Sequence, residues 1–190
     1  MARGDQYAVE SWPPPEVVPA LALAQHHGLP TCLLDFTWDP YVAAYFAARQ
    51  WIDAGSPTAP NHLCVWVIDD GRLALTYRSQ RHPIELVVPP ASDNRTLQAQ
   101  EGLFMWKPIS MEEIGDHTRK YEVHDVFETI LSAEGTGCSV KKILLNTNEA
   151  TMLLHKVIKL GYDSGRLFPT FEGAVRAVKE SMSARIGPRW

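Results

Sequence analysis

The stretch AQHHGLPTCLLDFT, residues 24–37, sets the organisation of the first part of the chain. Upstream, apolar residues recur at helical spacing over residues 17–24, which predicts a helix from about Glu16 to near Gly28. Gly28 accepts a positive φ and Pro30 blocks further helix, so the stretch predicts a helix-ending turn.

A second helix is predicted directly after this stretch. Asp39 and Pro40 suit the N-cap and first-turn positions of a helix. Val42, Tyr45 and Phe46 continue the helical spacing, and the helix is expected to run to about residue 54.

Short apolar runs and amphipathic spacing predict the remaining elements. Strands are expected at residues 62–69, 84–88, 103–107 and 140–145, and helices at 111–120, at 150–158 and after Pro169. One face of the last helix is expected to be apolar, with Phe171, Ala174, Val175, Val178 and Met182. This order predicts an α+β fold, a small mixed or antiparallel sheet flanked by helices.

The length of 190 residues favours a single domain, which we expect over residues 16–190. The net charge of −4 argues against a protein that coats nucleic acid or anionic membranes by bulk charge. Cys32, Cys64 and Cys138 are too scattered for a disulfide framework and predict reduced thiols in a cytoplasmic protein. No run of about 18 apolar residues is present, so no membrane contact is predicted, and no metal site is predicted either.

Common catalytic signatures are absent from the sequence. It contains neither of the glycine-rich phosphate-binding motifs, G-x-x-x-x-G-K-[ST] and G-x-G-x-x-G. It also lacks the G-x-S-x-G elbow and the H-E-x-x-H zinc helix. These absences argue against common ATPases, classical dehydrogenases, serine hydrolases and zinc proteases.

Two polar segments and one aromatic residue are candidates for a functional site. Residues 25–31 place two imidazoles, an amide and a hydroxyl at a helix end, where the macrodipole favours a histidine cation. Arg95 has the bidentate fork that holds a phosphate or carboxylate, and residues 98–101 add acceptors. Tyr45 has a ring that stacks on a planar ligand. A purely structural role stays open for each candidate. Residues 25–31 would then cap a helix, Arg95 and residues 98–101 would form a polar loop, and Tyr45 would be a core aromatic residue.

Residues 24–37 resemble the opening block of the FRG domain family, Q-H-x-G-L-P-T-x-L-L-D. Pro40 and residues 43–47 fit the continuation of that block. Residues 95–104 fit the family's R-x-x-x-A-Q-x-G-x-F block, and residues 167–173 fit its closing block. The resemblance therefore extends from about residue 20 to residue 180.

The chain departs from the family pattern in three places. Cys32 stands where the family usually has Arg, and Phe36 stands where it usually has Trp. The F/Y-R-G motif that gives the family its name is echoed only at Arg3 and Gly4, with alanine in the aromatic position. We therefore expect residues 1–15 to form an extended leader, a shortened form of that segment.

The family is similar in layout to ADP-ribosyltransferase-like toxins. The resemblance thus implies a protein of bacterial or phage type that binds NAD as a toxin or phage-defence effector, with ADP-ribosyltransferase or NAD-glycohydrolase activity. Arg3 would hold a phosphate of NAD, Tyr45 would stack on the nicotinamide, and Gln100 or Glu101 would take the acidic position. The implied catalytic residues are Gln100, Glu101 and His26, and the implied cofactor-binding residues are Arg3, Gln25, His27, Thr31, Tyr45 and Arg95.

A competing interpretation is a non-catalytic module that binds a protein or nucleic-acid partner. Gln100 cannot supply the negative charge that an oxocarbenium-like transition state requires. Cys32 also removes the five donors of the arginine usual at that turn. The sequence leaves both interpretations open.

Overall fold

A computed structural model describes residues 11–14, 16–26, 28–55, 61–69, 84–88, 95–110 and 140–186. Helices and small antiparallel sheets make up this part of the chain, which confirms the predicted α+β class. The chain divides into two compact units. The first unit comprises Met1–Leu34, Asp69–Pro89 and Phe104–Ser139, and the second comprises Asp35–Ile68, Pro90–Leu103 and Val140–Trp190.

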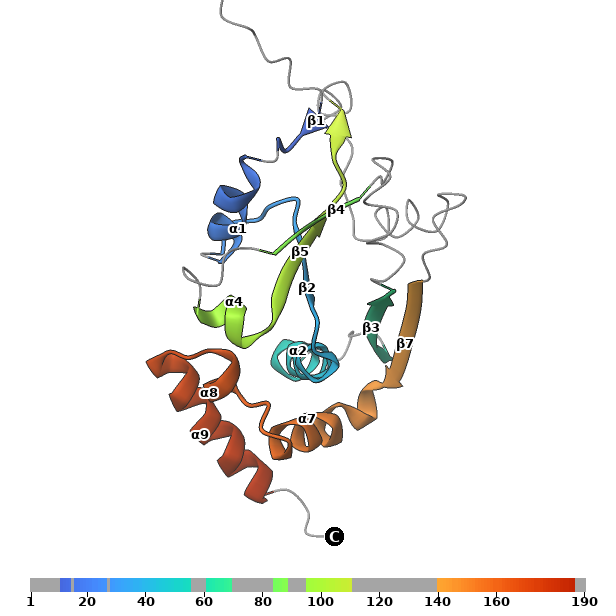
Figure 1. Cartoon of the computed structure of the whole chain (residues 1–190). Helices are drawn as coiled ribbons and strands as arrows, with labels where there is room; N and C mark the ends of the chain where they lie inside the picture. Colours follow the sequence, from blue (N-terminus) through green and yellow to red (C-terminus); the bar gives the residue numbers. More distant parts are fainter. Residues whose placement is uncertain are drawn as a thin grey trace, which may run out of the picture. The chain divides into compact units, whose positions relative to one another are not determined.

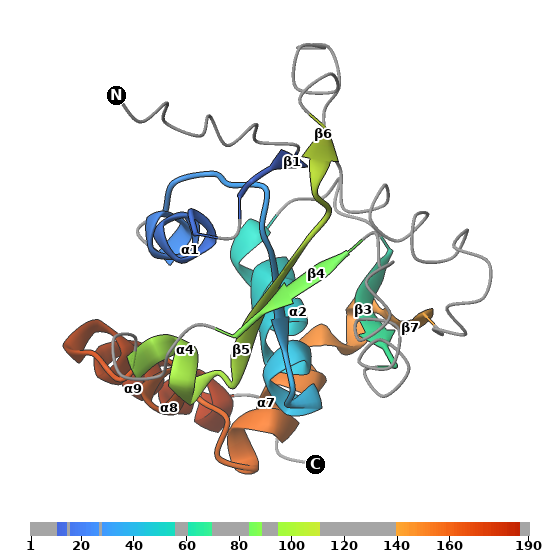
Figure 2. The ribbon, with the colours of Figure 1, turned by 45° about the horizontal axis from the view of Figure 1, so that its top comes forward.

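The first unit contains one described helix and two short antiparallel strand pairs (Figure 2). The helix is α1 (Val18–His26), and Gly28 follows it with a φ of +85°, as the predicted turn requires. Strand β1 (Ser11–Trp12) pairs with β6 (Ile109–Ser110), and β4 (Glu85–Val87) pairs with the end of β5 (Gly102–Trp106). Its core is formed by apolar side chains on these elements and at the residues directly before β4 and before β2 (Leu34–Thr37): Val18, Ala22, Leu33, Ile84, Phe104, Met105, Trp106 and Ile109.

The second unit contains a strand pair and several helices (Figure 1). Strand β3 (His62–Ile68) pairs antiparallel with β7 (Val140–Asn146) over its full length. The other elements are β2 (Leu34–Thr37), α2 (Pro40–Ala54), α4 (Arg95–Ala99), the start of β5, the 3₁₀ turn η1 (Thr147–Glu149), α7 (Ala150–Lys159), α8 (Ser164–Leu167) and α9 (Phe171–Ile186).

Helix α2 begins as its sequence predicts. The Oδ1 atom of Asp39 accepts a hydrogen bond from the backbone N–H of Tyr41 at 2.8 Å, and Pro40 occupies the first turn. An N-cap bond of this kind satisfies one of the four N–H groups that a helix start leaves without a partner. The helix buries Val42, Tyr45 and Ala48, which lie on one face at helical spacing.

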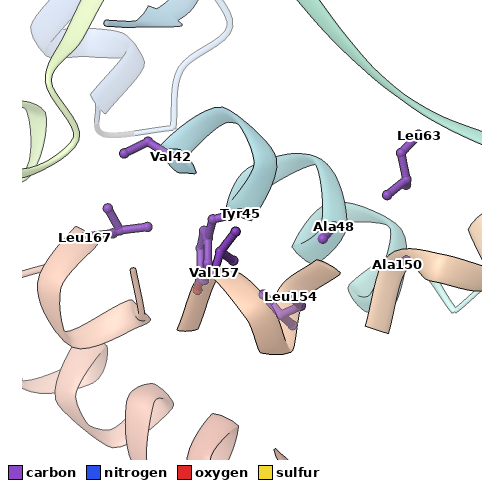
Figure 3. Close-up of a cluster of buried hydrophobic side chains, with 8 residues drawn as sticks. All are labelled: Val42, Tyr45, Ala48, Leu63, Ala150, Leu154, Val157 and Leu167. Carbon is purple, nitrogen blue, oxygen red and sulfur yellow. The ribbon is translucent and has the colours of Figure 1, made fainter. Parts of the chain in front are cut away.

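The core of the second unit lies around this face of α2 (Figure 3). Residues of α7 meet it, and Leu167 of α8 closes one end. The buried cluster comprises Val42, Tyr45, Ala48, Leu63, Ala150, Leu154, Val157 and Leu167. The apolar stripe predicted for α7 therefore packs in this cluster, through Ala150, Leu154 and Val157.

Several expectations need correction or lie outside the described residues. Strands β1, β2 and β6 and the short helices α4 and α8 were not predicted. Residues 98–101, for which a polar loop was one of the predictions, include the end of α4 and the turn after it. The helix predicted at 111–120 and residues 1–10 of the leader lie outside the described residues.

Helix α9 carries its predicted apolar stripe on the outside. Phe171, Val175, Val178 and Met182 are all exposed, whereas Gly173 and Glu180 are buried. The reason is the close approach at Gly173, where an added Cβ would lie 1.9 Å from the carbonyl oxygen of Phe168. The helix therefore packs on its small and polar face.

Candidate functional site

A buried polar network connects α2, α8 and α9 in the second unit. The hydroxyl of Tyr45 donates to Oε1 of Glu180 at 2.7 Å and lies 2.7 Å from Oγ of Ser164. Ser164 itself donates to Glu180 twice, from Oγ at 2.6 Å and from its backbone N–H at 3.0 Å. Because buried polar groups are costly unless they are hydrogen-bonded, this network fixes how the two helices meet α2.

Burial raises the pKa of Tyr45 to about 12, because the ionised phenolate would be poorly solvated there. The neighbouring hydroxyl of Ser164 opposes this effect, whereas the Glu180 carboxylate adds to it. Tyr45 is therefore a neutral hydrogen-bond donor over the whole physiological range.

Arg49 lies one turn further along α2 and connects the network to the surface. Its Nη1 atom is 3.8 Å from Oε1 of Glu180, and its Nη2 and Nε atoms contact the two carboxylate oxygens of Asp53 at 2.8 and 3.0 Å. A two-point contact between guanidinium and carboxylate restricts the arginine geometrically. These contacts therefore hold the Arg49 side chain in one orientation.

A pocket of about 210 Å³ opens beside this network, between α2, α7 and α9. We call it the α2–α7–α9 pocket. Its apolar wall consists of Ile52, Leu154 and Ile158, and three permanent cations line it together with the Glu180 carboxylate. The cations are Arg49, Arg176 and Lys179, and His155 of α7 also contributes to the lining.

Arg176 is supported by aromatic residues near the pocket. Its guanidinium carbon lies 5.5 Å from the centre of the Phe168 ring, and that ring meets Phe46 edge-on at 5.9 Å. A cation over an aromatic face is attracted by the ring quadrupole. The pocket therefore combines two oriented guanidinium groups with an apolar surface, which suits a ligand with both anionic and apolar parts.

Gln100 and Glu101, the predicted catalytic pair, lie in the turn between α4 and β5. The side-chain amide of Gln100 donates to the backbone carbonyl of Leu167 at 3.1 Å, and its backbone carbonyl accepts from the Thr37 hydroxyl at 2.7 Å. Glu101 is exposed and has a φ of +48°, and its carbonyl accepts from the backbone N–H of Trp38 at 3.1 Å. The amide of Gln100 thus connects two chain segments, whereas the contact of Glu101 is made by its backbone alone. The catalytic roles of both residues stay predictions.

Tyr45 and Arg95 lie in the second unit as well. The ring of Tyr45 is 0% exposed, so no face of it is accessible to a nicotinamide in this structure. Arg95 is exposed at the first position of α4 and does not line the α2–α7–α9 pocket. The ligand-binding roles of both residues stay predictions.

The histidine turn belongs to the first unit. There the hydroxyl of Thr31 donates to the Oε1 atom of Gln25 and also accepts from the backbone N–H of Leu33 at 3.1 Å. His26 ends α1, and nothing is described of its side chain. Arg3 and His27 lie outside the described residues, so their predicted roles stay predictions.

Tyr45 was predicted as a site residue, but its partners in the network and the charged residues of the pocket were not. Arg49 and Asp53 carry a signal, because opposite charges four residues apart on a helix face each other. Glu180 also carries one, since it is the acidic residue on the small-residue face of α9, beside Gly173 and Ala177. Ser164 has no such local signal, because its partner Tyr45 is 119 residues away in the sequence.

Comparison with known proteins identifies the class of the amino-terminal segment. The model of the FRG domain family matches residues 3–54, which confirms the predicted resemblance in that part of the chain. The match extends from Arg3 to the end of α2 and covers less than half of the chain. No curated protein and no solved structure matched the chain.

The matched segment includes Tyr45 and Arg49 but neither Ser164 nor Glu180. It also excludes the two later blocks on which the resemblance draws, residues 95–104 and 167–173. None of the described helices has the length and apolar character that crossing a membrane would need. The cytoplasmic location stays a prediction.

Proposed function

We propose that this chain is a non-catalytic FRG module that binds an acidic segment of a partner protein in the α2–α7–α9 pocket. The observation that carries the proposal is the composition of that pocket. Three permanent cations, Arg49, Arg176 and Lys179, lie against an apolar wall in one cavity of about 210 Å³.

The charge of the pocket favours an anionic ligand. Among the described residues of the lining, Glu180 is the one acidic residue, and its carboxylate oxygens accept hydrogen bonds from Tyr45 and Ser164. Arg49 is paired with Asp53, which lies outside the lining, but its positive charge still adds to those of Arg176 and Lys179. In a concave region the low-dielectric walls strengthen the attraction of this summed charge for an anion. Guanidinium groups also match the planar geometry of a carboxylate.

The apolar wall favours a protein partner over a nucleic acid. Ile52, Leu154 and Ile158 offer a surface for an aliphatic side chain that lies next to a carboxylate. Nucleic-acid binding draws on an extended basic surface, and the chain as a whole has a net charge of −4. A short segment that alternates acidic and aliphatic residues is therefore the ligand that the pocket suits best.

The described contacts also favour binding over catalysis. An ADP-ribosyltransferase-like toxin or defence effector needs an accessible aromatic ring and an acidic group at the reacting sugar. Here the ring of Tyr45 is fully buried, and the amide of Gln100 bonds to a backbone carbonyl. Both residues contribute to the fold, which supports the non-catalytic interpretation.

Fluorescence anisotropy with a labelled peptide tests the binding proposal. The probe is a short peptide that alternates glutamate with leucine, and a glutamine–leucine peptide of equal length is its neutral control. Arg176→Glu reverses a pocket charge and is expected to weaken binding at least about tenfold, equivalent to about 1.4 kcal/mol. Lys141→Glu makes the same charge change on the exposed face of β7, outside the pocket, and is the matched control.

Binding of the acidic peptide that Arg176→Glu weakens and Lys141→Glu leaves intact would support the proposal. Equal affinity for the acidic and neutral peptides would overturn it, as would equal weakening by both variants. Incubation with NAD tests the catalytic alternative separately. Release of nicotinamide, or addition of ADP-ribose to a target protein, would overturn the non-catalytic part of the proposal.

A further inference from the structure

Helix α9 presents a continuous apolar stripe to solvent. The exposed fractions are 81% for Phe171, 41% for Val175, 54% for Val178 and 60% for Met182. Eleven residues separate the first from the last, so the stripe extends about 17 Å along the helix at 1.5 Å per residue. Scattered surface apolar residues are ordinary, but an aligned row of four large ones marks an interaction surface.

The fold already uses the opposite face of this helix. Gly173 and Glu180 are buried and Ala177 is partly buried, and at 100° per residue they cluster on the side facing away from the stripe. Glu180 is fixed by Ser164 and Tyr45, and an added Cβ at Gly173 would meet Phe168. These contacts fix the rotation of α9, which keeps the stripe pointing outward.

The spacing of the stripe is that of a coiled-coil seam. Successive members are separated by four, three and four residues, which is the alternation of d and a positions in a heptad. With Val175 and Met182 as a positions, Phe171 and Val178 are d positions. A helix with this spacing packs against a second helix by inserting its side chains between those of the partner.

The stripe is self-complementary in an antiparallel pair. When Phe171 of one helix faces Met182 of another, the two valines face each other, so a large aromatic residue meets a flexible one. On one flank, the e positions hold Glu172 and Lys179, which carry opposite charges and face each other across an antiparallel pair.

The other flank of the seam supports the same arrangement. Its g positions hold Ala174 and Ser181, which are small and exposed and allow close approach. We propose that α9 forms an antiparallel pair with α9 of a second copy of this chain. The four apolar residues of the stripe do not line the α2–α7–α9 pocket, so variants of the two valines test the pairing without changing the pocket lining. Lys179 lies both in the pocket lining and on the flank of the seam, so its variants change both surfaces.

Sedimentation equilibrium of the full chain tests the pairing. A single helix pair is a small interface, so we expect a reversible dimer that dissociates between about 1 µM and about 1 mM. The double variant Val175→Glu/Val178→Glu places like charges at the centre of the seam and is expected to be monomeric over this range. Met152→Glu on α7, which is exposed, off the stripe and outside the pocket lining, adds a charge elsewhere and is expected to dimerise like the wild type.

Charge exchange tests the antiparallel register. Glu172→Lys and Lys179→Glu, each alone, create like-charge contacts and are expected to weaken the dimer several-fold. The combined exchange Glu172→Lys/Lys179→Glu restores opposite charges and is expected to restore the dimer. A wild type that stays monomeric throughout, a dimer unaffected by the valine variants, or a combined exchange that fails to restore association would each overturn the proposal.

Discussion

Replacement of Tyr45 by phenylalanine tests the buried network that positions α8 and α9 on α2. The change removes one hydroxyl and keeps the ring that packs in the core. The lost bond is a charge-assisted one of 2.7 Å to the Glu180 carboxylate. Hydrogen bonds to charged groups contribute about 1.5–3 kcal/mol each to stability.

Glu180 keeps its two bonds from Ser164 in the variant, so its carboxylate does not become an unpaired buried charge. We therefore expect Tyr45→Phe to lower the free energy of unfolding by about 2 kcal/mol at pH 7. For a chain of this size that corresponds to a fall in Tm of roughly 4–8 °C. Urea denaturation followed by far-UV circular dichroism measures the difference.

The difference in stability between wild type and Tyr45→Phe is also expected to depend on pH. The pKa of Tyr45 is raised to about 12 in the folded chain, against about 10 in an unfolded one. The stability that this difference contributes is fully present below about pH 10 and is lost as the pH rises through about 12. A difference of about two pKa units is equivalent to about 2.7 kcal/mol, so the stability gap between wild type and variant should close over this range.

Tyr41→Phe is the matched control, because Tyr41 is exposed on the same helix. It should change the free energy of unfolding by no more than about 0.5 kcal/mol. A gap for Tyr45→Phe below about 0.5 kcal/mol at pH 7, or one that stays constant up to about pH 12, would refute the reasoning.

Three further substitutions test the packing of the second unit, each by urea denaturation. Leu154→Ala should cost about 2–5 kcal/mol because it opens a cavity in the buried cluster, whereas Met152→Ala on the exposed face should cost less than about 1 kcal/mol. Gly173→Ala should cost at least about 1–3 kcal/mol, because its Cβ would lie 1.9 Å from a backbone oxygen; an unchanged stability would contradict the close approach of α9. Gln100→Ala should cost about 1–3 kcal/mol by leaving the Leu167 carbonyl without this donor, and a neutral effect would argue against a structural role.

Local signals predicted the longer elements of the fold. Asp39 and Pro40 fix the start of α2 through interactions within one helical turn. Strand β3 could be predicted because its β-branched and aromatic residues are contiguous. Helix α8 could not, because its four residues are too few to show a period and it is fixed by contacts of Ser164 to α2 and α9.

The orientation of α9 could not be read from its spacing either. Amphipathic spacing identifies an apolar face but not whether the same chain covers it. Here the close contact at Gly173 and the bonds of Glu180 decide which face is buried. Gly173 and Glu180 are not apolar residues, so the apolar spacing of the helix gives no indication that their face is the buried one.

The candidate site shows the same limit. The sequence predicted Tyr45 as a ligand-stacking residue, but its partners Ser164 and Glu180 are 119 and 135 residues away in the sequence. A tyrosine on an apolar helix face fits both a stacking and a core role, and only those distant partners distinguish the two. The pocket is lined by residues of three helices, so no single sequence motif predicts it.

The central claim is that an acidic protein segment binds in the α2–α7–α9 pocket. Methyl NMR of the full chain tests it most directly, with the glutamate–leucine peptide and NAD added in separate titrations. We predict that the peptide shifts the methyl signals of Ile52 and Ile158, which line the pocket, and leaves those of Ile143 on the exposed face of β7 unchanged. Unchanged pocket methyls on addition of the peptide, or pocket shifts produced by NAD instead, would contradict it.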